Sequence, residues 1–137
     1  MQIKLKDGKA TWKQEWREID GRRIFFRSRW EYRYALYLQL LKSKGEIKDW
    51  QHEPKTFWFE GIKRGTNNYK PDFLVIHKND AEEWVEVKGF MDDKSKTKIK
   101  RMAKYFPDVR LRVVEKEFFK NNSPKLKVLI KEWEWVS

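Results

Sequence analysis

The sequence predicts an α/β fold, in which a mixed central sheet is flanked by helices and preceded by a β-hairpin. Helical spacing of apolar residues starts after residue 28, strand patterns dominate residues 72–89, and a lysine-rich helical stretch follows. The expected order from residue 28 is therefore helix, three strands, helix, strand. The chain has 137 residues, of which 39% are hydrophobic. One domain with a single core is expected.

The N-terminal hairpin is expected in residues 10–26. Two strand-like runs meet there at Asp20-Gly21. Both residues of such a pair accept the positive φ angles that a tight two-residue hairpin turn requires. Residues 1–26 are therefore predicted to form an extension that precedes the main series of elements.

The first helix is expected in residues 28–45. Ser28 can cap its N-terminus, and Gly45 can end it. Tyr34, Leu38 and Leu41 recur at helical spacing, so they share the face that packs on the sheet.

The three strands that follow are expected in residues 46–60 and 72–89. The first run is rich in β-forming residues and contains Pro54, which marks a bend or a sheet edge. The second run divides at Asn79-Asp80, where a turn joins two strands.

The remaining elements are a basic helix in residues 92–106 and a strand in residues 109–115. A last helix is expected to follow, with Pro124 in its first turn. The segments 61–68 and 120–124 have the composition of loops. Trp133 and Trp135 alternate with glutamates, which favours a half-buried strand or an interface near the end of the chain.

The charge of the chain favours a nucleic-acid partner. Lysine and arginine outnumber aspartate and glutamate by 32 to 21, which gives a net charge of +11. A field this positive in a small domain is complementary to a phosphate backbone. The alternatives are a basic surface that only keeps the protein soluble, and a membrane surface, for which no basic amphipathic anchor is found.

No cysteine is present, which excludes disulfides and thiolate metal sites. The N-terminus lacks the apolar run of a signal peptide, and no apolar segment of membrane-spanning length occurs. These observations predict a cytoplasmic protein with no membrane partner.

Three charged residues occupy positions that a buried strand usually avoids. Asp72 starts one strand of the predicted hairpin, and Glu86 and Lys88 lie near the end of the other. A turn near Asn79 brings Asp72 beside Glu86, and two carboxylates with a strand carbonyl form a hard-oxygen site suited to Mg²⁺ or Mn²⁺. Lys88 would then orient a water or neutralise charge on a phosphate. The alternative is a surface ladder of salt bridges.

Glu31 is a fourth candidate in the first helix. It completes the pattern "SRWE", in which Ser28 and Glu31 form a capping box. Glu31 also leads the buried face of the helix, from where a carboxylate can reach the same metal. The two roles are compatible.

The pattern "KPDF…EVKG" after a helical glutamate resembles the PD-(D/E)XK nuclease superfamily, whose core has the order αβββαβ. The chain is also similar to phage Holliday-junction resolvases of the endonuclease I type. The matching segments are "FRSRWE" (26–31), "KSKG" (42–45), "YKPDF" (69–73), "VEVKG" (85–89) and "KYFPDVRLRVV" (104–114). The N-terminal hairpin and the "EWEWV" tail lie outside this resemblance.

The resemblance implies a restriction-endonuclease-like catalytic core in residues 27–114 and a C-terminal extension in residues 115–137. It implies that Glu31, Asp72, Glu86 and Lys88 are catalytic. It further implies that the metal ligands come from Asp72, Glu86, Glu31 and the carbonyl of Val87, and that the cofactor is Mg²⁺, for which Mn²⁺ can substitute.

The basic residues around these positions are expected to contact DNA phosphates. They are Arg27, Arg29, Lys70, Lys94, Lys96, Lys98, Lys100, Arg101 and Lys104. The alternative for the lysine-rich helix is a solvated face. Asp92 and Asp93 are better explained as charges at its N-terminus, and His52 and His77 are expected to have structural roles.

These observations predict a metal-dependent endonuclease that cleaves branched DNA, most specifically four-way junctions. A homodimer is expected, because two related nicks resolve a junction and two-fold symmetry supplies two sites. The alternatives are a nicking or repair nuclease of the same fold and a DNA-binding module without cleavage.

Overall fold

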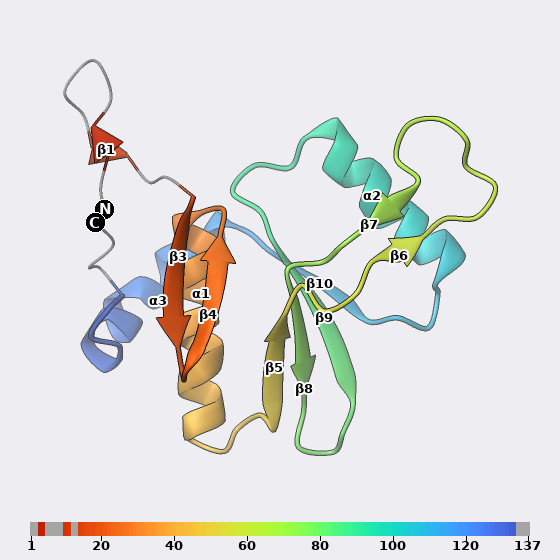
Figure 1. The fold of residues 1–137 in the computed structure, drawn as a ribbon. Helices are drawn as coiled ribbons and strands as arrows, with labels where there is room; N and C mark the ends of the chain where they lie inside the picture. The colour runs from red at the N-terminus through yellow and green to blue at the C-terminus, as the bar shows by residue number, and fades with distance from the viewer. Residues whose placement is uncertain (1–2, 5–9, 12–13, 134–137) are drawn as a thin grey trace.

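The computed structural model describes residues 3–4, 10–11 and 14–133 (Figure 1). In chain order the elements are β1 Ile3–Lys4, β2 Ala10–Thr11, β3 Glu15–Ile19, β4 Arg22–Phe26, α1 Arg29–Ser43, β5 Asp49–His52, β6 Phe57–Trp58, β7 Asn68–Tyr69, β8 Phe73–Ile76, β9 Glu82–Val87, α2 Asp93–Tyr105, β10 Leu111–Val114 and α3 Lys116–Leu129. None of the helices in these residues has the length and apolar character needed to cross a bilayer.

The central sheet has four strands in the order β10-β9-β8-β5. β8 is antiparallel to both β5 and β9, whereas β10 is parallel to β9. The predicted mixed α/β class is therefore confirmed. The expected order of elements is present as α1, β5, β8, β9, α2 and β10, with the small antiparallel pair β6–β7 inserted after β5. Asn68, which was expected in a loop, belongs to this pair.

The two faces of the sheet carry separate apolar clusters. Phe73, Val75 and Val85 alternate along β8 and β9 and pack in the larger cluster with residues of α1, α3 and the hairpin. Leu74 and Trp84 point to the other face and pack with residues of α2 and the β6–β7 region. Strand alternation thus divides the core in two, and Figure 1 shows the hairpin and α1 on one side of the sheet and α2 on the other.

The N-terminal hairpin is formed by β3 and β4, which pair from Ile19↔Arg22 to Glu15↔Phe26. Asp20 and Gly21 have φ angles of 52° and 76°, as a two-residue turn of this kind requires. Ile19, Ile24 and Phe26 are buried in the larger cluster. The hairpin is therefore an N-terminal extension that packs on the core.

The first helix begins and ends as expected. The Ser28 hydroxyl accepts a hydrogen bond from the Glu31 N–H at 3.0 Å. Gly45 has a φ of +74°, and its N–H donates to the Lys42 carbonyl. This is the left-handed position that favours glycine after a helix.

The prediction for the C-terminal helix was wrong at its start. The helix α3 begins at Lys116, and Pro124 lies inside it. Phe119 and Leu126 are buried on one face of α3, seven residues apart, so the apolar stripe outweighs the loop-like composition of residues 120–124. Pro124 has no N–H to donate to the Lys120 carbonyl, and Lys120 is an exposed residue.

The prediction of a strand or interface around Trp133 was also wrong. Trp133 is 1% exposed, follows α3 in a turn, and packs on Phe119. Its indole N–H donates to the Ser123 hydroxyl at 3.1 Å, and Arg33 donates to its carbonyl at 2.8 Å. Trp135 lies outside the described residues.

Replacing Phe119 by alanine tests whether α3 is part of the folding unit. Phe119 is 4% exposed and stacks on Trp30 at 4.9 Å between ring centroids. Phe119→Ala should lower the free energy of unfolding by about 3–5 kcal/mol, because it leaves a cavity in the larger cluster. Phe90→Ala, at a side chain that is 80% exposed, should change it by less than about 0.5 kcal/mol in the same urea titration. Equal values for the two variants would contradict this packing.

Candidate metal centre

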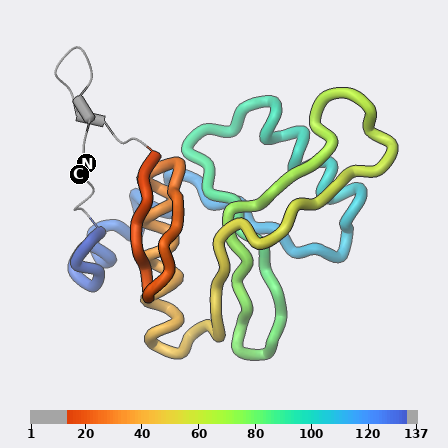
Figure 2. Tube along the Cα trace, viewed as in Figure 1, coloured from red at the N-terminus to blue at the C-terminus, as the bar shows by residue number. Residues whose placement is uncertain are grey.

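The candidate residues meet where three strands of the sheet end. The end of β5, the start of β8 and the end of β9 converge near the middle of the molecule (Figure 2). A strand end is a suitable place for charged groups, because the chain leaves the buried sheet there.

Asp72 and Glu86 lie opposite each other. Phe73 pairs with Val85 across β8 and β9, and the same register carried one residue further sets Asp72 against Glu86. The Asp72 carboxylate accepts a hydrogen bond from the Val87 N–H at 2.8 Å. This bond fixes Asp72 beside the main chain of Val87, whose carbonyl remains a predicted ligand.

Glu86 is 7% exposed and makes two polar contacts. The Tyr69 hydroxyl donates to its carboxylate at 2.6 Å, and the Lys88 ammonium lies 3.6 Å from its other oxygen. Tyr69 comes from β7, so the small β6–β7 pair supplies a donor to the carboxylate. Lys88 lies in the chain after β9 and is partly exposed.

Burial and mutual repulsion dominate the electrostatics of these carboxyl groups. Burial and the charges of Glu86, Glu31 and Glu53 raise the pKa of Asp72 well above its usual range. Burial also raises the pKa of Glu86, although the Tyr69 hydroxyl and the positive charges of Lys88 and Lys98 oppose the shift. A divalent cation would relieve the repulsion, so the oxygen ligands and the excess of negative charge fit Mg²⁺ or Mn²⁺.

Glu31 faces the centre from the first turn of α1 and is 5% exposed. One carboxylate oxygen lies 2.6 Å from Nε2 of His52. Among the hydrogen bonds of the described residues, the Glu31 side chain does not return one to the Ser28 N–H. Only half of the predicted capping box is therefore formed, and the carboxylate is directed to the strand ends instead.

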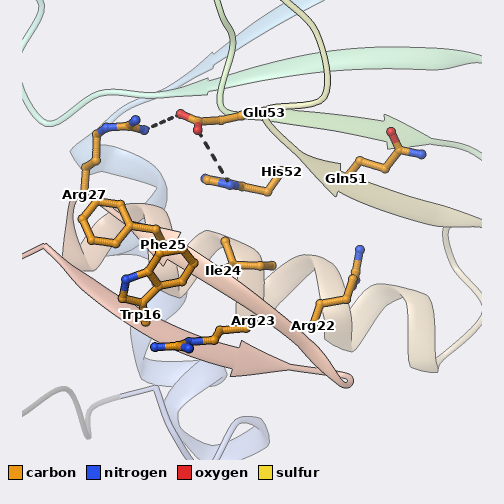
Figure 3. Close-up of a pocket in the computed structure, with 9 residues that line it drawn as sticks. All are labelled: Trp16, Arg22, Arg23, Ile24, Phe25, Arg27, Gln51, His52 and Glu53. Atoms are coloured by element: carbon orange, nitrogen blue, oxygen red, sulfur yellow. Dashed lines mark hydrogen bonds and ion pairs between the residues drawn. The ribbon is translucent and has the colours of Figure 1, made fainter.

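His52 and Glu53 complete the acidic cluster from the end of β5. A ligand atom from each of Glu31, His52 and Glu53 lies within 4.8 Å of the other two. Arg27 forms an ion pair with Glu53 at 2.5 Å, and this pair and the His52 ring are drawn in Figure 3. Sequence spacing gave no indication of His52, because the contact with Glu31 joins residues 21 positions apart. The second histidine, His77, lies at the opposite end of β8 beside Glu83, at 3.1 Å.

Gly89 explains how the chain leaves the centre. A Cβ atom at this position would lie 3.3 Å from the ring of Trp30, closer than ordinary packing allows. The chain after Lys88 therefore passes directly over the residue that precedes Glu31, which ties β9 to the start of α1.

The predicted DNA-binding residues divide into groups. On α2, Lys94 and Lys98 border a hollow beside the loop at residues 65–68. The positive charge of Lys98 also opposes the rise in the pKa of Glu86. Arg101, on the same face, donates to the Thr66 carbonyl and thus holds this loop.

The other predicted basic residues lie elsewhere. Lys96, Lys100 and Lys104 recur every four residues on α2, are exposed, and face away from the sheet. Arg27 is paired with Glu53, Lys70 is exposed beside Pro71, and Arg29 is partly buried. Asp92 caps α2 by accepting from the Ser95 N–H at 2.7 Å, as expected for a charge at the helix start.

The chain belongs to a protein family described as "Protein of unknown function (DUF1064)", whose model matches residues 11–122. The match extends from the N-terminal region into α3 and includes every residue of the candidate centre. No match was found among curated proteins or among solved structures. The description of the family states no activity, so the function has to be argued from the site.

Replacing Asp72 by asparagine tests the electrostatics of the metal-free centre. Because the folded pKa values of Asp72 and Glu86 are raised, the ionised pair destabilises the fold at neutral pH, and this cost disappears as the pH falls below the unfolded pKa values. Asp72→Asn should therefore raise the melting temperature near neutral pH, by roughly 3–5 °C for each kcal/mol of relieved repulsion. The difference should shrink in acid.

Thermal melts with Mg²⁺ complete this test. The metal should stabilise the unmodified protein and have a much smaller effect on Asp72→Asn, because binding to the folded state alone raises stability. Equal stabilisation of both proteins would place the metal elsewhere.

Proposed function

We propose that this member of the family is a metal-dependent DNA endonuclease that hydrolyses phosphodiesters in branched DNA, with four-way junctions as the preferred substrate and a homodimer as the active form. The observation that carries the proposal is the convergence of Asp72, Glu86 and Glu31 at the strand ends, with Lys88 at 3.6 Å from Glu86. Like charges held close together with partial burial destabilise a fold, so a function is the physical reason to keep them.

The proposed chemistry is hydrolysis at a phosphate held beside the carboxylates. When bound, Mg²⁺ or Mn²⁺ would neutralise charge on the scissile phosphate and lower the pKa of a bound water. Asp72 and Glu86 would hold the metal, together with the Val87 carbonyl. Lys88 would orient the attacking water or stabilise charge on the phosphate, because its ammonium lies at the edge of the centre and is partly exposed. Glu31 would complete the ligand set or hold the water.

The substrate class rests on charge and on the position of the basic residues. The net charge is +11. Lys98 lies beside Glu86, and Lys94 borders the neighbouring hollow on the same side of α2. Backbone phosphates that reach the carboxylates would thus pass these lysines. The preference for four-way junctions, and the homodimer that would make two related nicks, follow from the resemblance to junction resolvases.

Two other functions are compatible with parts of this arrangement. A nicking or repair nuclease of the same fold would use the same centre on another DNA form. A DNA-binding module would use the basic surface alone, but it gives no reason for the raised pKa values of Asp72 and Glu86. Incubation with junction, flap, duplex and single-stranded DNA in Mg²⁺ separates these functions, with a chelator as control.

Charge-removing variants of the centre should abolish cleavage and keep DNA binding. Asp72→Asn and Glu86→Gln should each lower the cleavage rate by at least about a hundredfold. Loss of a group that only supports a metal ligand already costs up to about that factor, and these carboxylates are proposed as ligands themselves. Lys88→Ala should be severely impaired while it still binds metal. The measurements are a junction cleavage assay and a gel-shift titration, and normal cleavage by the carboxylate variants would refute the site.

Glu31→Gln separates capping from catalysis. Glutamine retains the N–H that donates to Ser28 at 3.0 Å, so stability should change by no more than about 0.5–1 kcal/mol. If Glu31 holds the metal or the water, cleavage should fall by orders of magnitude in a folded protein. A melting curve and a Mg²⁺ cleavage assay measure both quantities, and an active variant would show that the Glu31 carboxylate is not needed for catalysis.

The two faces of α2 provide a matched comparison for DNA binding. Lys94→Gln with Lys98→Gln should weaken binding and reduce the slope of log K against log salt by about 0.9 for each lost phosphate contact. Lys96→Gln with Lys100→Gln removes the same charge from the opposite face and should have the smaller effect. Equal effects in salt-dependent titrations would mean that only net charge matters.

A further inference from the structure

A groove lies next to the candidate centre, between the hairpin and the end of β5. Its volume is about 550 Å³, within the range of clefts that hold small ligands, roughly 300–1,000 Å³. Figure 3 shows Trp16, Phe25 and Arg23 from the hairpin, and His52 and Glu53 from the strand end, around this groove.

The hairpin presents an aromatic pair to the groove, of which Trp16 is exposed and Phe25 is partly buried. Trp16 and Phe25 are directly opposite each other in the β3–β4 register, with ring centroids 5.3 Å apart. Trp16 is 53% exposed, whereas the inward-facing Ile24 and Phe26 of the same hairpin are buried. The core therefore does not explain a tryptophan at this position, and a large part of this side chain is open to solvent.

The groove is also positively charged. Among the described residues its lining includes Arg22, Arg23 and Arg27, with Glu53 as the one acidic residue. Arg27 is neutralised by Glu53 at 2.5 Å. The guanidinium of Arg23 lies over the Trp16 ring at 4.9 Å and has no carboxylate within ion-pair distance in the described part of the chain. A cation next to an exposed aromatic face is the combination that binds a phosphate and the base attached to it.

The groove is continuous with the centre. His52 and Glu53 line it, and the same two residues have ligand atoms within 4.8 Å of the Glu31 carboxylate. A DNA strand with its scissile phosphate at the carboxylates would thus place a neighbouring nucleotide in the groove.

We propose that this groove binds one unpaired nucleotide at a branch point, next to the scissile phosphate, with its base stacked on Trp16 and a phosphate near Arg23. The inference rests on the proposed nuclease function and narrows its substrate class to DNA in which a base is free to leave the helical stack. A base inside a continuous duplex is stacked between its neighbours and cannot lie flat on Trp16.

The test measures binding without cleavage. Two DNAs with the same number of nucleotides, and hence nearly the same charge, are titrated in the presence of a chelator: a continuous duplex, and a branched DNA with one unpaired 2-aminopurine at the branch point. Stacking on Trp16 should quench the 2-aminopurine fluorescence. Trp16→Ala should remove the quenching and weaken binding to the branched DNA by about tenfold, within the range for loss of one base stack. Its affinity for the duplex should be unchanged, and Trp16→Phe should restore most of the effect.

Trp58→Ala is the matched control. Trp58 is also exposed, at 61%, but it lies in β6 and does not line the groove, so the variant should behave as the unmodified protein. Equal losses on both DNAs for Trp16→Ala, or no loss on either, would overturn the proposal, provided that melting curves show a folded variant. Because no metal is present, these outcomes are independent of cleavage. A protein that quenches 2-aminopurine but never cleaves DNA in Mg²⁺ would instead refute the nuclease function and keep the groove as a binding site.

Discussion

Asp72 and Glu86 face each other across two antiparallel strands, and the rest of the structure is arranged so that this pair can persist. Two carboxylates on directly opposite positions of neighbouring strands repel each other, and burial adds the cost of lost hydration. The surroundings offset that cost with a few specific groups. The Val87 N–H donates to Asp72, and the Tyr69 hydroxyl and the Lys88 ammonium lie against Glu86. Two of these groups come from the end of β9 and the residue that follows it, and the third comes from β7.

The position of the pair follows from the register of the sheet. A slip of one residue between β8 and β9 would turn Glu86 toward the face where Phe73 and Val85 are buried, and would expose apolar side chains on the other. The two apolar clusters therefore specify the geometry of the carboxylates as well as the fold. The β6–β7 pair adds Tyr69 from one face, and α1 adds Glu31 from the other.

Local rules predicted the parts of the fold that local chemistry determines. Asp20-Gly21 and Ser28 act through their own backbone angles and hydrogen bonds, so the hairpin turn and the start of α1 could be read from a few residues. Pro124 shows the limit of such rules, because the buried stripe of Phe119 and Leu126 outweighs a local breaker. The acidic pair could be predicted for the same reason as the turn, because one hairpin joins Asp72 to Glu86. The contact of Glu31 with His52 joins a helix to an edge strand, and no local pattern carries that information.

The distribution of positive charge over the surface could not be predicted either, because the net charge does not say which side of the molecule carries the basic residues. In the fold, Lys94 and Lys98 approach the carboxylates from the face covered by α2, while Arg23 and Trp16 lie beyond His52 and Glu53 on the side of the hairpin. The two groups lie on opposite sides of the strand ends. In the proposed nuclease, a DNA strand that contacts both groups would pass the carboxylates between them, where a metal would neutralise a phosphate. Arginine and lysine on the two sides are not equivalent. The planar guanidinium of Arg23 lies over an aromatic ring, whereas the lysines are flexible point charges. In the proposed nuclease, the hairpin side would distinguish the shape of a nucleotide, and the α2 side would hold a backbone regardless of its sequence.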